Sequence, residues 1–173
     1  MISRHMGIVE HIHIARAKAA PMEAVDHIDV VKGVGVVGDR HALAPGEWDE
    51  SHLGEELTLV EAESLENLAR DHGIDLAPGD TRRTVTTRGI SLNELVGRRF
   101  RVGEVVVAEG VELCEPCSHL QGLLGKQILR PLAHRAGIRA VLVQDGSIQV
   151  GDEVEEIGAA ELVPASASEQ TTH

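Results

Sequence analysis

Two cysteines, Cys114 and Cys117, are spaced so that both thiols could act on one ligand. They precede the expected helix Ser118–Leu124, whose dipole and free amides favour a thiolate at its start. Such a thiolate can ligate a soft metal, attack an electrophile or exchange disulfides. A zinc site would need further donors, for which His119 and His134 are the candidates. A redox dithiol and a pair of inert thiols are the other interpretations, and the residues alone leave all of these open.

A block of basic side chains follows residue 80 in a chain that is acidic overall: Arg82, Arg83 and Arg88. Guanidinium groups suit planar or tetrahedral oxyanions because their N–H donors form a fork. In a strand, Arg82 and Thr84 face the side opposite to Arg83, so only one of the two neighbouring arginines needs to enter a site. The alternative is a solvated edge strand that is kept soluble by its charge.

A glycine-rich stretch, from Gly33 to Gly38, leads into Asp39, Arg40 and His41. Its glycine spacing resembles a dinucleotide-binding fingerprint only loosely, because no helix is expected to follow it. We interpret it as a turn that presents three polar side chains to an anion or another ligand. For His41 the alternative is a capping or other structural role.

Most of the chain that must position these residues is predicted to be β-strand. Short segments rich in Val and Ile, bounded by Gly, Pro or Asp, predict strands at 8–14, 24–31, 57–60, 84–87, 99–102, 105–107, 111–113, 138–143, 148–150 and 154–157. Helices are expected at 61–72, from Ser91 to before Gly97, at 118–124 and at 127–134. Many short strands with a few short helices indicate a mainly β fold, a β-barrel or a strongly bent sheet.

The charge distribution narrows the class of partner. The net charge is −12, yet residues 81–140 carry ten basic and five acidic side chains. A chain of this charge with 1% aromatic residues, Trp48 and Phe100, is unsuited to binding nucleic acid by phosphate contacts or base stacking. No apolar run approaches the roughly 20 residues that span a bilayer, so we expect no membrane segment and a cytoplasmic protein.

The order of short motifs along the chain is more specific than any one of them. They are Gly38-Asp-Arg-His41, Leu57-Thr-Leu-Val-Glu61, Pro78-Gly-Asp80, Arg82-Arg-Thr-Val-Thr86, Arg88-Gly89, Leu95-Val-Gly97, Phe100-Arg-Val-Gly103, Cys114-Glu-Pro-Cys117 and Val150-Gly-Asp152. This order resembles that of a stand-alone MOSC domain, named after the C-terminal domain of molybdenum cofactor sulfurases. The resemblance extends from about Gly7 to Ile157. We therefore expect a MOSC domain over residues 7–160 and a polar tail without fixed structure over residues 161–173.

The resemblance implies a β-barrel related to the pyruvate-kinase barrel and a pocket for the molybdenum cofactor, a pterin dithiolene with a phosphate tail. It implies that Cys117 is the protein ligand to molybdenum. The expected cofactor-binding side chains are Arg40, Arg82, Arg83, Thr84, Arg88 and, as an optional neighbour, Cys114. Thr84 stands where this family usually has Asn in an Arg-Arg-Asn-Val stretch, and a hydroxyl could take over part of the amide's hydrogen bonding.

The resemblance also implies a reaction. Proteins similar to the mitochondrial amidoxime-reducing component and to bacterial hydroxylaminopurine reductases cleave N–O bonds of N-hydroxylated compounds. In such a reductase the metal carries the redox step, and the protein binds and orients the substrate. Asp39 or His41 could supply a proton to the leaving water.

Other cofactors and partners follow from what the chain holds. Pyridoxal phosphate belongs to the fused sulfurases, and 173 residues leave no room for that domain. A reductase without a flavin motif or a cysteine-rich cluster pattern needs a flavin or iron–sulfur electron-donor protein, and an oligomer is compatible with the sequence. Two other functions stay open: a carrier of cofactor or persulfide sulfur on Cys117, and a zinc or dithiol site at Cys114 and Cys117.

Overall fold

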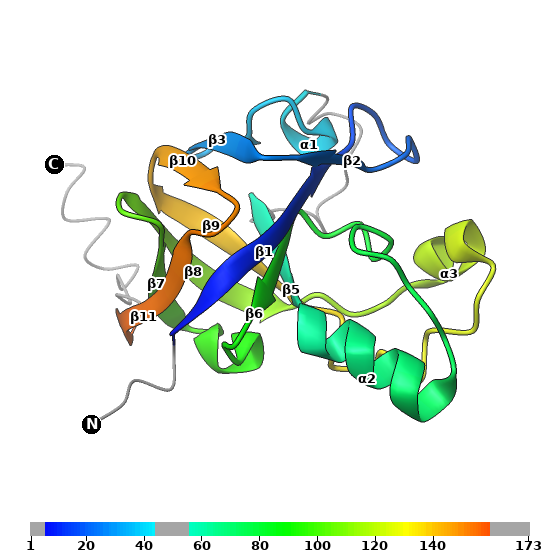
Figure 1. The fold of residues 1–173 in the computed structure, drawn as a ribbon. Helices are drawn as coiled ribbons and strands as arrows, with labels where there is room; N and C mark the ends of the chain where they lie inside the picture. The colour runs from blue at the N-terminus through cyan, green and yellow to red at the C-terminus, as the bar shows by residue number, and fades with distance from the viewer. Residues whose placement is uncertain (1–5, 44–55, 160–173) are drawn as a thin grey trace, which may run out of the picture.

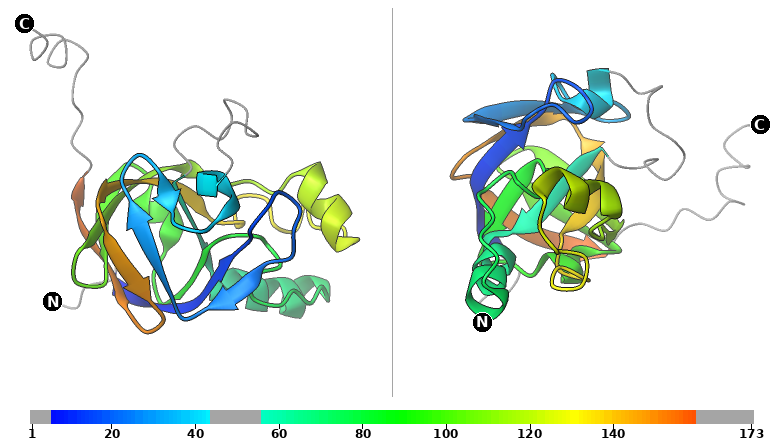
Figure 2. Two further views of the ribbon diagram at one scale, coloured as in Figure 1. Left: turned by 90° about the horizontal axis from the view of Figure 1, so that it is seen from above. Right: turned by 90° about the vertical axis from the view of Figure 1, so that its right-hand side faces the viewer.

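A closed β-barrel forms the body of the protein in a computed structural model that describes residues 6–43 and 56–159. Seven strands close it, and around the barrel they are β1 (Met6–Ile14), β11 (Glu153–Ala159), β7 (Arg98–Val102), β8 (Val106–Leu113), β9 (Ile138–Gln144), β5 (Leu57–Glu61) and β6 (Val85–Arg88). Figure 2 shows the barrel from two further sides. The predicted mainly β fold with a β-barrel is therefore confirmed. Trp48 and the predicted tail at residues 161–173 lie outside the described residues.

Antiparallel pairing joins all of these neighbours except β5 and β6, which run parallel. Parallel neighbours need a long crossover connection. Here the crossover contains α2 (Ala62–His72) and the segment that precedes β6. In Figure 1, α2 lies below the barrel, beside the end of β5. This crossover delivers Arg82 and Arg83, which the sequence marks as functional, to the edge of the barrel.

A smaller sheet covers one end of the barrel. It contains β10 (Gly146–Gln149), β3 (His27–Val31) and β4 (Gly35–Val36), while the short β2 (Glu23–Val25) pairs with β1. The prediction of a single strand at 24–31 is wrong, because this segment forms two strands, β2 and β3, with different partners. They are separated at Asp26, whose carbonyl accepts a hydrogen bond from the Val150 amide. The strands predicted separately at 105–107 and 111–113 form one strand, β8, with two register shifts.

Apolar side chains that alternate along the strands fill the barrel. Along β8 and β7, for example, Phe100, Val102, Val106 and Ala108 are fully buried. This period of two is the pattern that the sequence shows, because successive side chains of a strand point to opposite faces. Each large apolar side chain buried in this way stabilises the fold by about 1.5–3 kcal/mol.

A second apolar cluster holds the helices against one another. Its buried members are Leu68, Leu120, Ile128, Leu132 and Ala136. The cluster joins α2 to α3 (Ser118–Leu124) and to the segment that follows α3. The predicted helix at 127–134 is wrong: this segment forms turns, because Pro131 lacks the amide that a helix interior needs. The short helix predicted between Ser91 and Gly97 is a single 3-10 turn, η3 (Leu92–Leu95). None of the described helices is long and apolar enough to cross a membrane.

Candidate functional site

Cys117 is exposed at the point where the chain leaves the barrel. β8 ends at Leu113, and Cys117 is the residue immediately before α3. Cys114, by contrast, is 4% exposed, and its amide donates a 2.8 Å hydrogen bond to the carbonyl of Gly137. Both cysteines belong to the described part of the chain, and no disulfide joins them. Only Cys117 therefore presents its thiol to a ligand.

The thiol of Cys117 opens into a small basic pocket of about 100 Å³, here called the Cys117 pocket. Its lining residues are Lys18, Ala19, Arg40, His41, Thr81, Arg82, Arg83, Cys117, His119 and Leu120. They come from the loop after β1, the short helix α1 (Arg40–Leu43), the approach to β6 and the start of α3. Four lining side chains are cationic, and none of the described lining residues is a carboxylate. The pocket is therefore suited to an anionic ligand that also carries a group to which a thiol can bind.

Asp39 fixes two members of this pocket from behind. Its carboxylate is 2% exposed, and Oδ1 accepts hydrogen bonds from Arg40 Nη1 and from the amide of Ala15, both at 3.0 Å. Oδ2 lies 3.2 Å from Nδ1 of His41. Burial alone would raise the pKa of Asp39, but the hydrogen bond with His41 and the charge of Arg40 outweigh this effect and lower it. Asp39 is thus an ionised positioning group, and it is not among the lining residues.

Arg82 brings an unpaired donor to the pocket. Its backbone has a φ of +63°, a left-handed conformation that non-glycine residues adopt at a cost. Its Nη1 donates a 2.7 Å hydrogen bond to the carbonyl of Ala20, but its buried Nη2 has no partner among the described residues. The buried hydroxyl of Thr81 likewise has no partner within the described part of the chain. Burial, followed by the charge of Arg40, lowers the pKa of Arg82. Arg82 and Thr81 both line the Cys117 pocket, so its wall contains two residues with unpaired donors, which buried polar groups rarely have.

Arg83 ties the Cys117 segment to the barrel. Its guanidinium donates to three carbonyls: Nε to Ala136 at 2.9 Å, Nη1 to Thr81 at 3.2 Å and Nη2 to Cys114 at 3.0 Å. These acceptors belong to three separate parts of the chain. Arg83 therefore holds the strand end before Cys117 in place, in addition to contributing charge to the pocket.

A larger cavity of about 440 Å³ adjoins the Cys117 pocket, since Ala19 and Arg82 line both. His13 also lines this cavity; it is 7% exposed, and its Nδ1 has no partner among the described residues. Burial and the neighbouring His11 lower the pKa of His13, against an opposing effect of Asp80. The two adjoining spaces give room for a ligand that is larger than the Cys117 pocket alone.

A family model of the MOSC domain matches residues 41–155 of the chain. The chain belongs to the MOSC domain family. MOSC domains are associated with molybdenum cofactor binding or with sulfur-carrier roles. No curated protein matches the chain.

Solved structures show the same fold. This MOSC domain is similar to the YuaD protein of Bacillus subtilis, with a TM-score of 0.73 and 20% sequence identity over 93% of this chain and 100% of that one. It is similar to YiiM of Geobacillus stearothermophilus, with a TM-score of 0.67 and 15% identity over 88% of this chain and 75% of the other. It is also similar to YiiM of Escherichia coli, with a TM-score of 0.64 and 15% identity over 96% of this chain and 75% of the other.

Within this MOSC domain, six of the side chains singled out from the sequence line one pocket: Arg40, His41, Arg82, Arg83, Cys117 and His119. Two polar lining residues, Lys18 and Thr81, were not predicted from the sequence. Thr81 could have been found from the sequence, because it directly precedes the arginine pair Arg82 and Arg83. Lys18 follows β1 by a few residues and carries no motif, so that only the fold reveals it.

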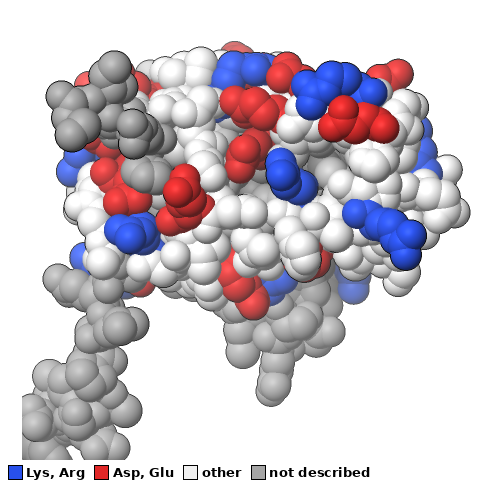
Figure 3. All heavy atoms as spheres, turned by 90° about the horizontal axis from the view of Figure 1, so that it is seen from below, with Lys and Arg blue, Asp and Glu red and all other residues white. Residues whose placement is uncertain are grey.

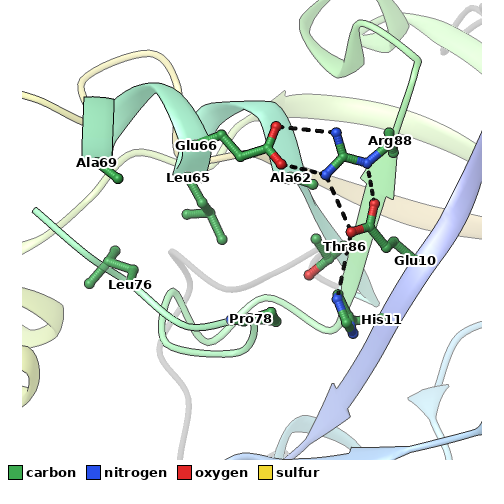
Figure 4. A pocket seen from close by; sticks show the side chains of 10 residues that line it. All are labelled: Glu10, His11, Ala62, Leu65, Glu66, Ala69, Leu76, Pro78, Thr86 and Arg88. Atoms are coloured by element: carbon green, nitrogen blue, oxygen red, sulfur yellow. Dashed lines mark hydrogen bonds and ion pairs between the residues drawn. The ribbon is translucent and has the colours of Figure 1, made fainter. Parts of the chain in front are cut away.

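Three other selected residues lie elsewhere in the MOSC domain. Thr84 is buried, and its amide bonds the Thr58 hydroxyl at 3.0 Å. Cys114 is buried, and its carbonyl accepts the hydrogen bond from Arg83 Nη2. Arg88 faces a different pocket, shown in Figure 4, where its guanidinium is held by Glu10 and Glu66.

The zinc interpretation finds no ligand set among the described residues, where no group of three or more His, Cys, Asp and Glu side chains could hold a metal. His134 instead pairs with Glu115, with Nδ1 and Oε2 2.5 Å apart. A metal that needs a single protein thiolate and takes its other ligands from a cofactor is compatible with this arrangement.

Proposed function

We propose that this MOSC domain binds the molybdenum cofactor, with Cys117 as the protein ligand to the metal and with Arg40 and Arg82 on the phosphate. The observation that carries the proposal is the meeting of an exposed thiol with two unpaired buried donors, Arg82 Nη2 and the Thr81 hydroxyl, in a cationic pocket. A thiolate suits a soft, sulfur-bound metal, and a guanidinium suits a phosphate. The family association supports the same ligand.

The proposed reaction is reduction of an N-hydroxylated compound with cleavage of its N–O bond. When bound, the cofactor supplies the two-electron oxygen transfer. The chain supplies a proton: Nδ1 of His41 faces the ionised Asp39 at 3.2 Å, which leaves Nε2 as the atom that delivers a proton to the departing oxygen. Asp39 keeps this ring oriented, because its other oxygen is fixed by Ala15 and Arg40.

A reductase of this kind needs an electron donor. The chain has two cysteines, too few for the four thiolates that usually hold an iron–sulfur cluster. We therefore propose a separate flavin or iron–sulfur protein as donor and a cytoplasmic location, where thiols such as Cys117 stay reduced. We also propose residues 7–160 as the extent of the domain.

Metal analysis tests the cofactor site directly. Protein produced in cells that make the molybdenum cofactor is expected to contain about one molybdenum per chain. Cys117→Ser is expected to lose nearly all of it, whereas Cys114→Ser, the matched control at a buried thiol, keeps it. Equal molybdenum in the wild type and in Cys117→Ser would contradict the proposed ligand. Stoichiometric zinc without molybdenum would favour the zinc site instead.

Turnover separates a reductase from a carrier. Molybdenum-loaded protein with a chemical electron donor is assayed on N-hydroxyadenine and benzamidoxime. Reduction that falls at least tenfold in His41→Phe, with molybdenum content unchanged, supports the reductase and the role of His41. Bound cofactor with no reduction of either compound would favour a carrier of cofactor or sulfur, the second role associated with this family.

A further inference from the structure

A second pocket lies between α2 and the barrel and shares no lining residue with the Cys117 pocket. This α2 pocket has a volume of about 220 Å³. Its lining residues are Glu10, His11, Ala62, Leu65, Glu66, Ala69, Leu76, Pro78, Thr86 and Arg88. They come from β1, α2, β6 and the loop that follows α2. Nothing in the proposed reaction uses this pocket.

The α2 pocket has one apolar and one polar side. In Figure 4, Leu65 and Ala69 of α2 and Leu76 of the following loop form one side, while the polar residues of β1 and β6 stand opposite them. A ligand that fits must therefore have an apolar body and a polar edge. Because an apolar cavity of about 150 Å³ accommodates benzene, the α2 pocket is large enough for a single ring with a small head group.

Thr86 supplies an unsatisfied group to the polar side. The residue is 1% exposed, and its hydroxyl has no hydrogen-bond partner among the described residues. Figure 4 shows the hydroxyl oxygen directed into the pocket. A buried hydroxyl without a partner destabilises the fold, so a bound group that pairs with it gains an interaction that the empty pocket lacks.

The charge of the polar side favours a cation. Arg88 is held between two carboxylates: Nε lies 2.5 Å from Glu10 Oε2, and Nη2 lies 2.6 Å from Glu66 Oε2. Arg88, Glu10 and Glu66 together bring one positive and two negative charges to this side. Figure 3, which views the molecule from below, shows acidic and basic side chains next to one another on this face, so no wide basic patch offsets the excess carboxylate. An anion would have to displace Glu10 or Glu66 from Arg88. A cation, by contrast, can donate hydrogen bonds to the remaining lone pairs of both carboxylates.

We propose that the α2 pocket binds a small organic monocation with a single-ring body, of the arylamidine or arylalkylamine class. The ring packs between Leu65, Ala69 and Leu76, and the cationic N–H groups donate to Thr86 and Glu10. The α2 pocket shares no lining residue with the Cys117 pocket, and it shares Pro78 with the adjoining cavity. The proposed cation therefore contacts neither Cys117 nor the arginines of the proposed cofactor site.

Three isosteric probes test the charge preference: benzamidine, benzamide and benzoate, titrated into the full chain by calorimetry or protein NMR. We expect saturable benzamidine binding in the millimolar range or tighter, weaker benzamide binding and the weakest binding for benzoate. Absence of saturable benzamidine binding, or preference for benzoate, would overturn the proposal.

Variants place the ligand. Ala69→Phe fills the pocket and is expected to weaken benzamidine binding at least tenfold, and Thr86→Val, which removes only the hydroxyl, to weaken it about fivefold. Glu66→Gln should also weaken binding, while Asp71→Asn, the same charge change elsewhere on α2, should not. Cys117→Ser should bind benzamidine like the wild type. Loss of binding in Cys117→Ser with full binding in Ala69→Phe would move the ligand to the Cys117 pocket and overturn the assignment.

Discussion

Arg83 offers the sharpest test of how the candidate site is held together. Its guanidinium donates three hydrogen bonds to the carbonyls of Thr81, Cys114 and Ala136. Hydrogen bonds that involve a charged group contribute about 1.5–3 kcal/mol each when buried. Because the Arg83 side chain is only half-buried, water replaces part of each bond, and we take about 1 kcal/mol per bond. Arg83→Met is therefore expected to lower the free energy of unfolding by about 3 kcal/mol.

Two measurements check this value. Urea unfolding gives the free energy directly, and about 3 kcal/mol corresponds to a drop in Tm of about 6–12 °C for a chain of this size. The rate at which a thiol reagent modifies Cys114, measured in a Cys117→Ser background, reports the local effect. In the wild type this thiol is 4% exposed. If the reagent reaches Cys114 only when the three Arg83 hydrogen bonds open, Arg83→Met should accelerate the modification of Cys114 by about a hundredfold, the factor that corresponds to about 3 kcal/mol.

The control is Arg70→Met, because Arg70 is an exposed arginine whose ion pair with the adjacent Asp71 is screened by water and contributes little to stability. Arg70→Met should leave both the free energy of unfolding and the modification rate of Cys114 nearly unchanged. The reasoning is refuted if Arg83→Met unfolds within about 0.5 kcal/mol of the wild type and Cys114 stays equally protected.

Two further substitutions test the electrostatics and the backbone. Asp39→Asn is expected to lower the free energy of unfolding by about 3 kcal/mol at neutral pH. Since the folded pKa of Asp39 lies below its ordinary value of 3.8, the carboxylate stabilises the fold above that pH, and its contribution is lost as the pH falls through the folded pKa. The difference between variant and wild type should therefore shrink in acid urea titrations; a constant difference would contradict the assignment. Gly137→Ala would place a Cβ 2.0 Å from the carbonyl oxygen of Leu59 at a φ of +102°, so we expect a loss of about 3 kcal/mol or more. Gly97→Ala, at a φ of +79° with open space around it, should cost about 1 kcal/mol in the same unfolding assay; equal losses would show that the contact with Leu59 is unimportant.

The sequence predicted the barrel well because its strands are short, rich in Val and Ile, and bounded by turn residues. Partners of polar side chains could not be predicted in the same way. Arg88 resembles an anion-binding arginine in the sequence, yet Glu10 and Glu66 hold it. Those two carboxylates lie 78 and 22 residues away along the chain. Only the pairing of strands and the position of α2 bring them together.

The neighbouring arginines show a second limit. Strand alternation predicted that only one of Arg82 and Arg83 needs to enter the site, but both line the Cys117 pocket. Alternation does not apply to them, because β6 begins at Val85 and Arg82 has a left-handed backbone. A non-glycine residue at positive φ has no clear signature in a single sequence, since the surrounding structure imposes it.

The single parallel pair of the barrel, β5 and β6, has a consequence for how this protein can be changed. Its crossover, residues 62–84, supplies wall residues to the α2 pocket and to the Cys117 pocket, while the strands on either side keep their backbone hydrogen bonds. Exchange of this one loop-helix segment would therefore alter both ligand surfaces at once and leave the ladder of the barrel intact. Part of each ligand surface is encoded in the crossover, outside the barrel ladder, whereas Glu10 and Thr86 of the α2 pocket belong to the barrel strands β1 and β6. The crossover is therefore the natural unit for redesign or for recombination among proteins of this fold.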